Sequence, residues 1–257
     1  MLLAIDVGNT HTIFGLFKGA KLHCHWRVRT DRQITADELA VQFNSLLSLQ
    51  SVSVKAIDQA IIASVVPPMQ AALEGYINRY LGLSPFIVDH HHTAGMRILI
   101  DSPSEVGADR IVNAVAARDK YGVPAVIVDF GTAITFDCVS PEGHYLGGAI
   151  APGMAIALEA LGARTAKLPR VDISKAQPSA IGTSTESAIR AGMLFGYGGM
   201  VEGLLREIRK GLSTAGPLQI IATGGMAELI APYAPSIQIV DPHLTLEGLR
   251  ILHANSI

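Results

Sequence analysis

The chain has 257 residues, of which 49% are hydrophobic and 16% charged, and its 20 basic and 22 acidic residues leave a formal net charge of -2. This composition excludes a disordered chain and predicts a well-filled core in one large domain or two modest ones. No run of Lys and Arg is longer than two, which argues against nucleic acid as the main partner and favours a small molecule.

The cysteines and the apolar runs bear on the compartment. Cys24 and Cys138 form no spacing motif, and two thiols exclude a disulfide framework. Asp6 interrupts the apolar N-terminus before a signal peptide could form, and no stretch approaches the roughly 20 apolar residues of a membrane helix. The sequence therefore predicts a cytoplasmic protein with no membrane partner.

The first half of the chain reads as short apolar strands and amphipathic helices. Strands are predicted at 2–6, 12–17, 22–29, 60–66 and 86–89. Thr35-Ala36-Asp37-Glu38 is a capping box that begins a helix to about residue 49, and a second helix is predicted at about 69–81.

The pattern starts again after about residue 115. Strands are predicted at 125–130, 134–139, 145–150 and 219–222, and helices at 184–210, with Thr183 or Ser184 as its cap, and at about 226–233. The segment Ile5–Asn9 can be laid on Val128–Thr132, because each is a strand that ends in Asp-x-Gly and doubles back. We therefore predict two similar α/β halves, 1–114 and 115–257, with the boundary inside a helix near 105–121.

Asp6-Val7-Gly8-Asn9-Thr10 is the first segment that could carry chemistry. A glycine lets the backbone turn tightly and bring N–H groups close to a phosphate, and Asp6 at the strand end could hold Mg²⁺. The same residues also suit an ordinary hairpin turn, so this segment alone leaves both interpretations open.

Two later segments complete a pattern. Asp129-Phe130-Gly131-Thr132-Ala133 ends an equivalent strand, and Thr223-Gly224-Gly225 follows the strand at 219–222 and could accept part of a nucleotide. Their order resembles that of the superfamily of actin, sugar kinases and heat-shock chaperones. This resemblance implies an α/β fold of two ribonuclease H-like (actin-like ATPase) halves, each a mixed β-sheet with flanking helices, and phosphoryl transfer.

Glu105-Val106-Gly107-Ala108-Asp109-Arg110 places a carboxylate and a guanidinium side by side at the start of a helix. Acidic residues are favoured at a helix N-terminus, where the charge of Asp109 is expected to be stabilised. The functional interpretation is that Asp109 accepts a hydroxyl proton while Arg110 holds a carboxylate.

Type III pantothenate kinases resemble this chain in the motifs Asp6–Thr10, Glu105–Arg110 and Asp129–Ala133, and also in Gly147–Met154 and Ile181–Ser187. The resemblance spans about residues 1–250. It implies ATP-dependent phosphorylation of the primary hydroxyl of pantothenate to 4'-phosphopantothenate, the first step of coenzyme A biosynthesis. It also implies a homodimer, and as cofactors Mg²⁺ and a monovalent cation, K⁺ or NH₄⁺.

The resemblance further assigns roles to residues. Asp109 would be the proton acceptor, Asp129 would bind the monovalent cation and Asp6 would position Mg²⁺. ATP would be bound by Asp6, Val7, Gly8, Asn9, Thr10, His11, Thr12, Ile13 and Thr132. Pantothenate would be bound by Gly107, Ala108, Asp109, Arg110 and, across a dimer interface, Thr185.

The sequence departs from the family at two places. Thr183-Ser184 stands where Lys-Asn is usual, and Ile100 stands where many members have a Tyr that contacts the substrate. Two alternatives stay open beside the kinase, namely a non-enzymatic transcriptional regulator of the same family and another small-molecule kinase of the superfamily.

The helix predicted at 184–210 is apolar on every side from Ala188 to Val201 and contains Gly192, Gly196, Gly198 and Gly199. A helix that is apolar all round must be covered all round. We therefore expect it to lie in a subunit interface.

Overall fold

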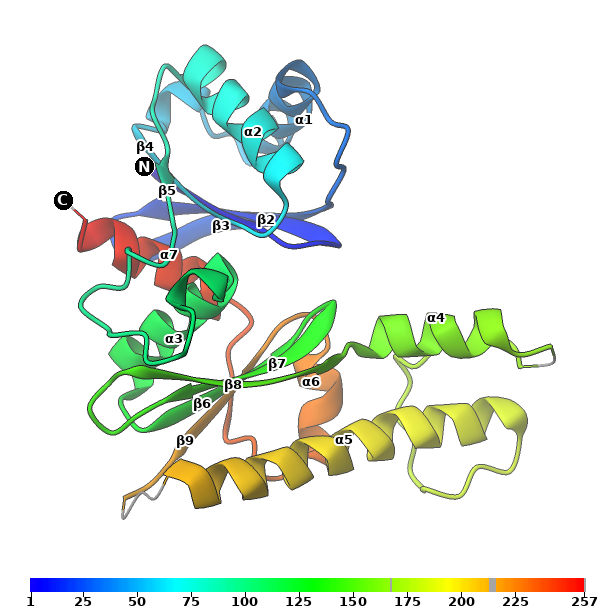
Figure 1. The fold of residues 1–257 in the computed structure, drawn as a ribbon. Helices are drawn as coiled ribbons and strands as arrows, with labels where there is room; N and C mark the ends of the chain where they lie inside the picture. The colour runs from blue at the N-terminus through cyan, green and yellow to red at the C-terminus, as the bar shows by residue number, and fades with distance from the viewer. Residues whose placement is uncertain (167, 213–215, 257) are drawn as a thin grey trace. The chain divides into compact units, whose positions relative to one another are not determined.

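The computed structural model describes residues 1–166, 168–212 and 216–256. The chain divides into two compact units, and each is built on one five-stranded sheet (Figure 1). Unit 1 contains Met1–Ala116 and the segment from His243 onward, and unit 2 contains Ala117–Pro242. The sequence predicted that the segment from His243 onward belongs to the C-terminal half. In the structure this segment packs with unit 1.

The sheet of unit 1 has the strand order β3-β2-β1-β4-β5. Its strands are β1 (Leu2–Val7), β2 (His11–Lys18), β3 (Lys21–Arg29), β4 (Gln59–Ser64) and β5 (Phe86–Ile87). The central strand β1 is antiparallel to β2 and parallel to β4. Helices α1 (Ala36–Leu49) and α2 (Pro67–Tyr76) cover one face, and α7 (Leu244–Ala254) packs on β1, β2 and β4. With both faces covered, β1 is apolar and buried along almost its whole length.

The sheet of unit 2 repeats this arrangement in the order β10-β9-β6-β7-β8. Its strands are β6 (Ala125–Phe130), β7 (Ala133–Val139), β8 (Tyr145–Pro152), β9 (Gln219–Thr223) and β10 (Ile239–Val240). The central β6 is antiparallel to β7 and parallel to β9, as β1 is to β2 and β4. The shared topology confirms the predicted fold of two similar mixed sheets with flanking helices.

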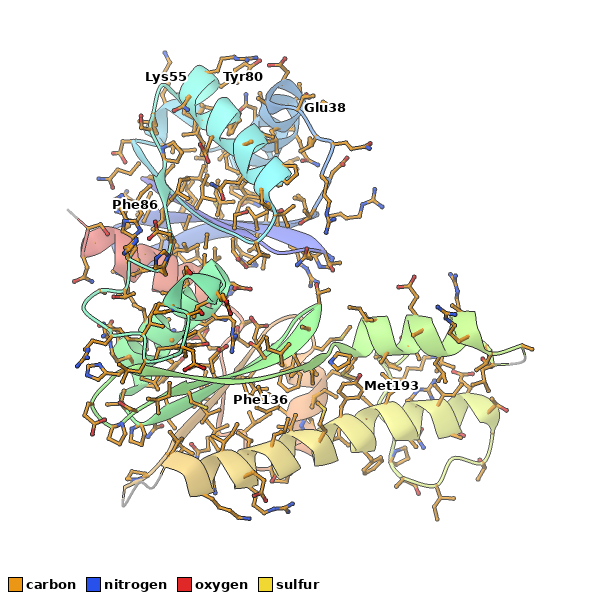
Figure 2. All side chains as sticks on the ribbon, viewed as in Figure 1. Glu38, Lys55, Tyr80, Phe86, Phe136 and Met193 are labelled. Atoms are coloured by element: carbon orange, nitrogen blue, oxygen red, sulfur yellow. The ribbon has the colours of Figure 1, made fainter. Side chains whose placement is uncertain are left out.

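Four helices complete unit 2 or lead into it. They are α3 (Ala108–Tyr121), which runs from unit 1 into unit 2, α4 (Met154–Arg164), α5 (Thr185–Leu212) and α6 (Ala227–Ile230). Phe136 on β7 and Met193 on α5, both labelled in Figure 2, belong to one buried cluster between the sheet and α5. The sequence analysis did not predict α4 or α7.

Local rules explain where the first helices begin. The capping box at α1 is present, because the Thr35 amide donates to Glu38 Oε2 at 2.8 Å and the Glu38 amide donates to Thr35 Oγ1 at 3.2 Å. Helix α2 starts at Pro67, two residues earlier than expected, since proline is favoured in the first turn. It continues as a π-turn over Ile77–Leu81, which ends at Gly82 with a left-handed backbone.

Candidate active site

The turn between β1 and β2 is closed by its own backbone and by Thr30. The Gly8 amide donates to the His11 carbonyl at 3.0 Å, and the Thr30 amide donates to the Thr10 carbonyl at 2.9 Å. The Thr30 hydroxyl donates to the Gly8 carbonyl at 2.7 Å and lies 3.0 Å from the hydroxyl of the buried Thr12. A Cβ at position 8 would lie 3.1 Å from the His11 carbonyl oxygen, so glycine suits this turn best.

Two arginines hold side chains of this turn. Arg32 Nη2 donates to Asn9 Oδ1 at 3.0 Å. Arg27 Nη2 lies 2.9 Å from Nδ1 of His11 and 3.4 Å from its Nε2. Burial lowers the pKa of His11, and the nearby Arg27 charge lowers it further. His11 is therefore a neutral ring near pH 7, with its lone pair turned toward Arg27.

The turn between β6 and β7 is the counterpart in unit 2 and is one residue shorter. The Gly131 amide donates to the Ala133 carbonyl at 3.1 Å, and the Gly153 amide donates to the Thr132 carbonyl at 3.1 Å. A Cβ at position 153 would lie only 2.1 Å from that carbonyl oxygen, so the end of β8 can approach Thr132 only through a glycine.

Asp129 of this turn lies against the glycine corner that follows β9. Asp129 pairs with Thr223 in the parallel register, and Gly224 adopts a φ of +89°. A Cβ at position 224 would lie 2.4 Å from Asp129 Oδ1. Two of the segments singled out in the sequence therefore meet inside unit 2.

Gly107 and Asp109 lie at the start of α3, after a short 3₁₀ turn at Pro103–Glu105. Asp109 Oδ1 accepts from the Arg110 amide at 2.8 Å, and a Cβ at position 107 would lie 2.5 Å from the same oxygen. Glycine at 107 thus leaves room for the carboxylate.

The charge of Asp109 is destabilised, contrary to the expectation from the helix end. Burial raises the pKa of this carboxyl, and the Arg110 amide and the Arg110 charge only partly oppose it. The predicted stabilisation of this charge was wrong because the desolvation of the carboxyl outweighs the favourable effect of the helix terminus.

The turn between β1 and β2 and the Asp109 segment both approach Val65 within unit 1. The Val65 amide donates to the Val7 carbonyl at 3.0 Å. A Cβ at position 107 would touch Val65 Cγ1 at 3.6 Å. Val65, directly after β4, therefore lies near both the end of β1 and Gly107, and the parallel pairing of β1 with β4 places the ends of these two strands at the same sheet edge.

A cavity of about 540 Å³ opens in the loop upstream of this segment. Its walls include His91, Met96, Ile98 and Ser104. Its volume is within the range of small-molecule pockets. Ile100 lies in the same loop and is half-buried.

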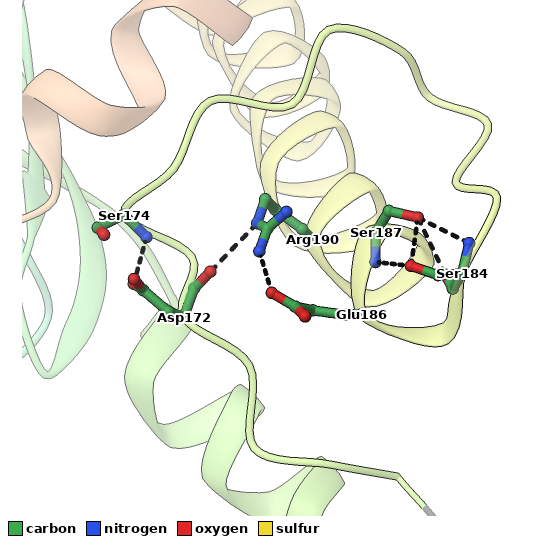
Figure 3. A network of polar contacts seen from close by, with 6 residues as sticks. All are labelled: Asp172, Ser174, Ser184, Glu186, Ser187 and Arg190. Atoms are coloured by element: carbon green, nitrogen blue, oxygen red, sulfur yellow. Dashed lines mark hydrogen bonds and ion pairs between the residues drawn. The ribbon is translucent and has the colours of Figure 1, made fainter.

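Thr185 is the first residue of α5, whose start is fixed by a reciprocal cap (Figure 3). The Ser187 amide donates to Ser184 Oγ at 3.1 Å, and the Ser184 amide donates to Ser187 Oγ at 2.9 Å. Of the two residues expected as the cap, Ser184 is therefore the one. Arg190 donates to the Asp172 carbonyl at 3.1 Å and pairs with Glu186, so the loop before α5 is held to its first turns.

The structure thus places the site residues expected from the sequence in both units. Asp6–Ile13 and Gly107–Arg110 belong to unit 1, and Asp129, Thr132 and Thr185 belong to unit 2. Thr30, Arg27 and Arg32 were not predicted from the sequence as neighbours of the turn. No local signal could have found them, because they reach it only through the β2–β3 pairing.

Comparison with known proteins identifies the family. A sequence profile described as type III pantothenate kinase matches residues 2–207. The type III pantothenate kinase of Moorella thermoacetica is 49% identical over 253 residues, which are 98% of this chain and 98% of the relative. That of Desulfosudis oleivorans is 46% identical and covers 100% of both chains. The chain belongs to the type III pantothenate kinase family.

Solved structures share the fold of this type III pantothenate kinase family member at low sequence identity. A conserved Baf family protein from Campylobacter jejuni superposes with a TM-score of 0.57 at 17% identity, covering 99% of this chain and 98% of the other. The inorganic polyphosphate/ATP-glucomannokinase of an Arthrobacter strain gives a TM-score of 0.53 at 15% identity, with coverage of 100% and 99%. The fold is that of the actin-like ATPases and sugar kinases.

A type III pantothenate kinase is a phosphotransferase, and kinases use ATP and generally a divalent metal. Within 1–166, 168–212 and 216–256, no group of three or more His, Cys, Asp or Glu side chains could hold a metal ion. Mg²⁺ is commonly held by one or two carboxylates together with phosphates and water. The carboxylates of Asp6 and Asp129, each near the end of a central strand, supply the oxygen ligands that hard cations prefer.

Among the helices of the described residues, none combines the length and the apolar character needed to cross a bilayer.

Proposed function

We propose that the chain transfers the γ-phosphoryl group of ATP to the primary hydroxyl of pantothenate, giving 4'-phosphopantothenate and ADP in the first step of coenzyme A biosynthesis. The observation that carries this proposal is the placement of Asp109. Its carboxyl has a raised pKa, and Gly107 of the same segment lies near Val65, whose amide donates a hydrogen bond to the last residue of the nucleotide strand β1.

Asp109 is the proton acceptor in this mechanism. The substrate hydroxyl oxygen attacks the γ-phosphorus, the bond from that phosphorus to the β,γ-bridging oxygen breaks, and the hydroxyl proton passes to a carboxylate oxygen of Asp109. A raised pKa suits a general base, because a stronger base takes the proton more readily. Arg110, the next residue, pairs with the substrate carboxylate or with the negative charge that develops during the transfer. Gly107 and Ala108 complete the substrate segment.

ATP binds at the two turns. Asp6–Ile13 supplies the first, with Gly8 allowing close approach of the phosphates, and Thr132 supplies a hydroxyl from the second. Asp6 holds Mg²⁺, which neutralises phosphate charge when bound. Asp129 holds K⁺ or NH₄⁺. The support for Asp129 is its position in the tight contact with Gly224 beside the second turn.

The active protein is a homodimer in this proposal, with Thr185 serving the site of the partner. One side of α5 packs in the core of unit 2, where Ala191, Leu194 and Val201 are buried. Another side is exposed and carries Ala188, Gly192, Phe195, Gly196 and Gly199. Small residues around one aromatic ring leave a smooth face against which a second helix could pack closely.

The cytoplasm, where ATP is available, is the proposed compartment, and pantothenate and ATP are the proposed partners, with no role for nucleic acid or membranes. The alternatives of a non-enzymatic regulator and of another kinase are not favoured, since relatives that match almost the full chain at 44% to 49% identity are named type III pantothenate kinase.

An ADP-coupled assay tests the activity. Pantothenate is compared with a panel of hydroxy acids and sugars at saturating ATP, and the product is identified by mass. We expect turnover with pantothenate at least tenfold above any other acceptor. Faster turnover of a sugar or another hydroxy acid would replace pantothenate as the substrate, and ATP binding without turnover of any acceptor would favour a regulator.

A further inference from the structure

The turn between β1 and β2 has its hydrogen-bond acceptors occupied from within the protein. The carbonyls of Gly8 and Thr10 accept from Thr30, and that of His11 accepts from Gly8. The carbonyl of Val7, just before the turn, accepts from Val65. These four backbone carbonyls are therefore already engaged within the protein, which favours an anion over a hydrogen-bond donor next to them.

Arg32 also occupies the acceptor of the Asn9 side chain. A guanidinium can only donate, so the Asn9 atom that faces Arg32 at 3.0 Å must be the amide oxygen. This contact fixes the orientation of the amide and turns its NH₂ group away from Arg32. Within the described parts of the chain that NH₂ group donates to no protein acceptor. Asn9 and Arg32 are both exposed, so the two donors of the amide are available to a ligand.

Positive charge on β3, which pairs with β2, comes from Lys21, Arg27 and Arg29, because burial and the neighbouring His243 lower the pKa of His25. The exposed positions of β3 are, without exception, Lys or Arg or His, namely Lys21, His23, His25, Arg27 and Arg29. Arg27 and Arg29 pair with Ile13 and His11 at the end nearest the turn. Asp31, the one acidic residue of this stretch, accepts from the Gln33 amide. The chain as a whole has a net charge of -2, so this basic face is a local feature.

We propose that Arg32 positions Asn9 for the phosphates of a nucleoside triphosphate, and that Arg27 and Arg32 form a second, basic wall of the phosphate site. This inference rests on the proposed function and adds residues 27–32 to a nucleotide site that the sequence analysis ended at Ile13. The charge of the wall makes the site prefer a triphosphate to a nucleoside with fewer phosphates.

Calorimetric binding of ATP, ADP and adenosine to the full-length chain tests the proposal. In Arg32→Gln we expect the Kd for ATP to rise about tenfold, the low end for a charge-assisted hydrogen bond because the residue is exposed. Adenosine should bind as in the wild type. Arg32→Lys keeps a charge and a donor and should recover most of the affinity. Lys21→Gln removes the same charge at the far end of the same strand face and is the matched control.

Steady-state kinetics and a double-mutant cycle of Arg32 and Asn9 give two further tests. Arg32→Gln should raise KM for ATP while KM for pantothenate and the melting temperature stay unchanged. If Arg32 acts through Asn9, Arg32→Gln added to Asn9→Ala should cost less than it does in the wild type. Unchanged ATP affinity in Arg32→Gln, or an equal loss in Lys21→Gln, would overturn the inference and leave the kinase assignment standing. A wild-type chain that binds no ATP would instead overturn the proposed function.

Discussion

The carboxylate of Asp129 occupies the space that a side chain at Gly224 would need. A Cβ at position 224 would lie 2.4 Å from Asp129 Oδ1 and 2.7 Å from the backbone nitrogen of Phe130. Gly224 also has a φ of +89°, which residues with a side chain rarely adopt. The corner after β9 can therefore meet the end of β6 only because it is glycine.

The variant Gly224→Ala should lose both stability and nucleotide binding. The overlap and the backbone conformation together should lower the free energy of unfolding by roughly 2–4 kcal/mol. Urea unfolding measures this loss. Gly162→Ala in α4 is the control, because a Cβ there meets nothing within 4 Å, and alanine in a helix should be neutral or stabilising by up to about 1 kcal/mol. Equal stability of the two variants would contradict the observed contact.

The variant Asp109→Asn should lose turnover and gain stability at neutral pH. Turnover should fall by about 10²–10⁴-fold, because Asn cannot accept the proton. Since burial raises the pKa of Asp109, this group contributes stability below its unfolded pKa and loses that contribution as pH rises through the folded pKa. The gain of the Asn variant over the wild type should therefore grow from about pH 4 upward.

Activity against pH gives a separate measurement on Asp109. In the wild type kcat/KM should rise with pH across a pKa above the ordinary value for Asp, since only the ionised carboxylate accepts a proton. An Asn variant that keeps more than a tenth of wild-type turnover, or one that unfolds, would return Asp109 to a structural role.

The buried carboxylate of Asp241 makes Lys120 a stabilising residue of unit 2. Asp241 Oδ2 accepts from Lys120 at 2.5 Å and from the Tyr121 hydroxyl at 2.8 Å, and Asp241 is only 7% exposed. Lys120→Met leaves this carboxylate without its cation and should cost roughly 1–3 kcal/mol of unfolding free energy. Lys210→Met, which breaks an exposed pair with Glu207, should cost less than about 0.5 kcal/mol in the same denaturation experiment.

The monovalent cation proposed at Asp129 predicts a salt-specific rate. Activity should rise steeply with KCl or NH₄Cl and stay low in NaCl at the same ionic strength. Asp129→Asn should abolish this difference while Asp172→Asn, an exposed carboxylate elsewhere in unit 2, should keep it. Equal wild-type rates in the three salts would remove the cation role from Asp129.

The proposed homodimer makes a complementation experiment possible. If Thr185 serves the partner's site, a hybrid of Thr185→Ala and Asp109→Asn subunits carries one site with both residues intact. Mixing the two impaired proteins under conditions that exchange subunits should therefore recover activity, up to about half that of the wild type per hybrid dimer. Light scattering that shows an active monomer at micromolar concentration, or mixing without recovery, would contradict this arrangement.

The sequence alone determined the features that depend on neighbouring residues. The capping box at Thr35, the glycine turns after Asp6 and Asp129, and the repeated strand pattern all follow from local backbone preferences. Their common order was enough to predict the fold and the family. Helix α4 escaped prediction because apolar residues also stand on its exposed side, namely Ala155, Ile156 and Ala160, and obscure the helical spacing of the less exposed positions 154, 157, 158 and 161.

Tertiary structure decided the features that depend on residues far apart in the chain. Helix α7 joins unit 1 because Gly248 lets it approach the Val112 carbonyl, where a Cβ would lie only 2.2 Å away. Arg32 contacts Asn9 because the pairing of β2 with β3 brings the two residues together, although they are far apart in the sequence. Asp109 has a raised pKa because folding removes it from water, and desolvation is a property of the packed protein that a linear sequence does not display.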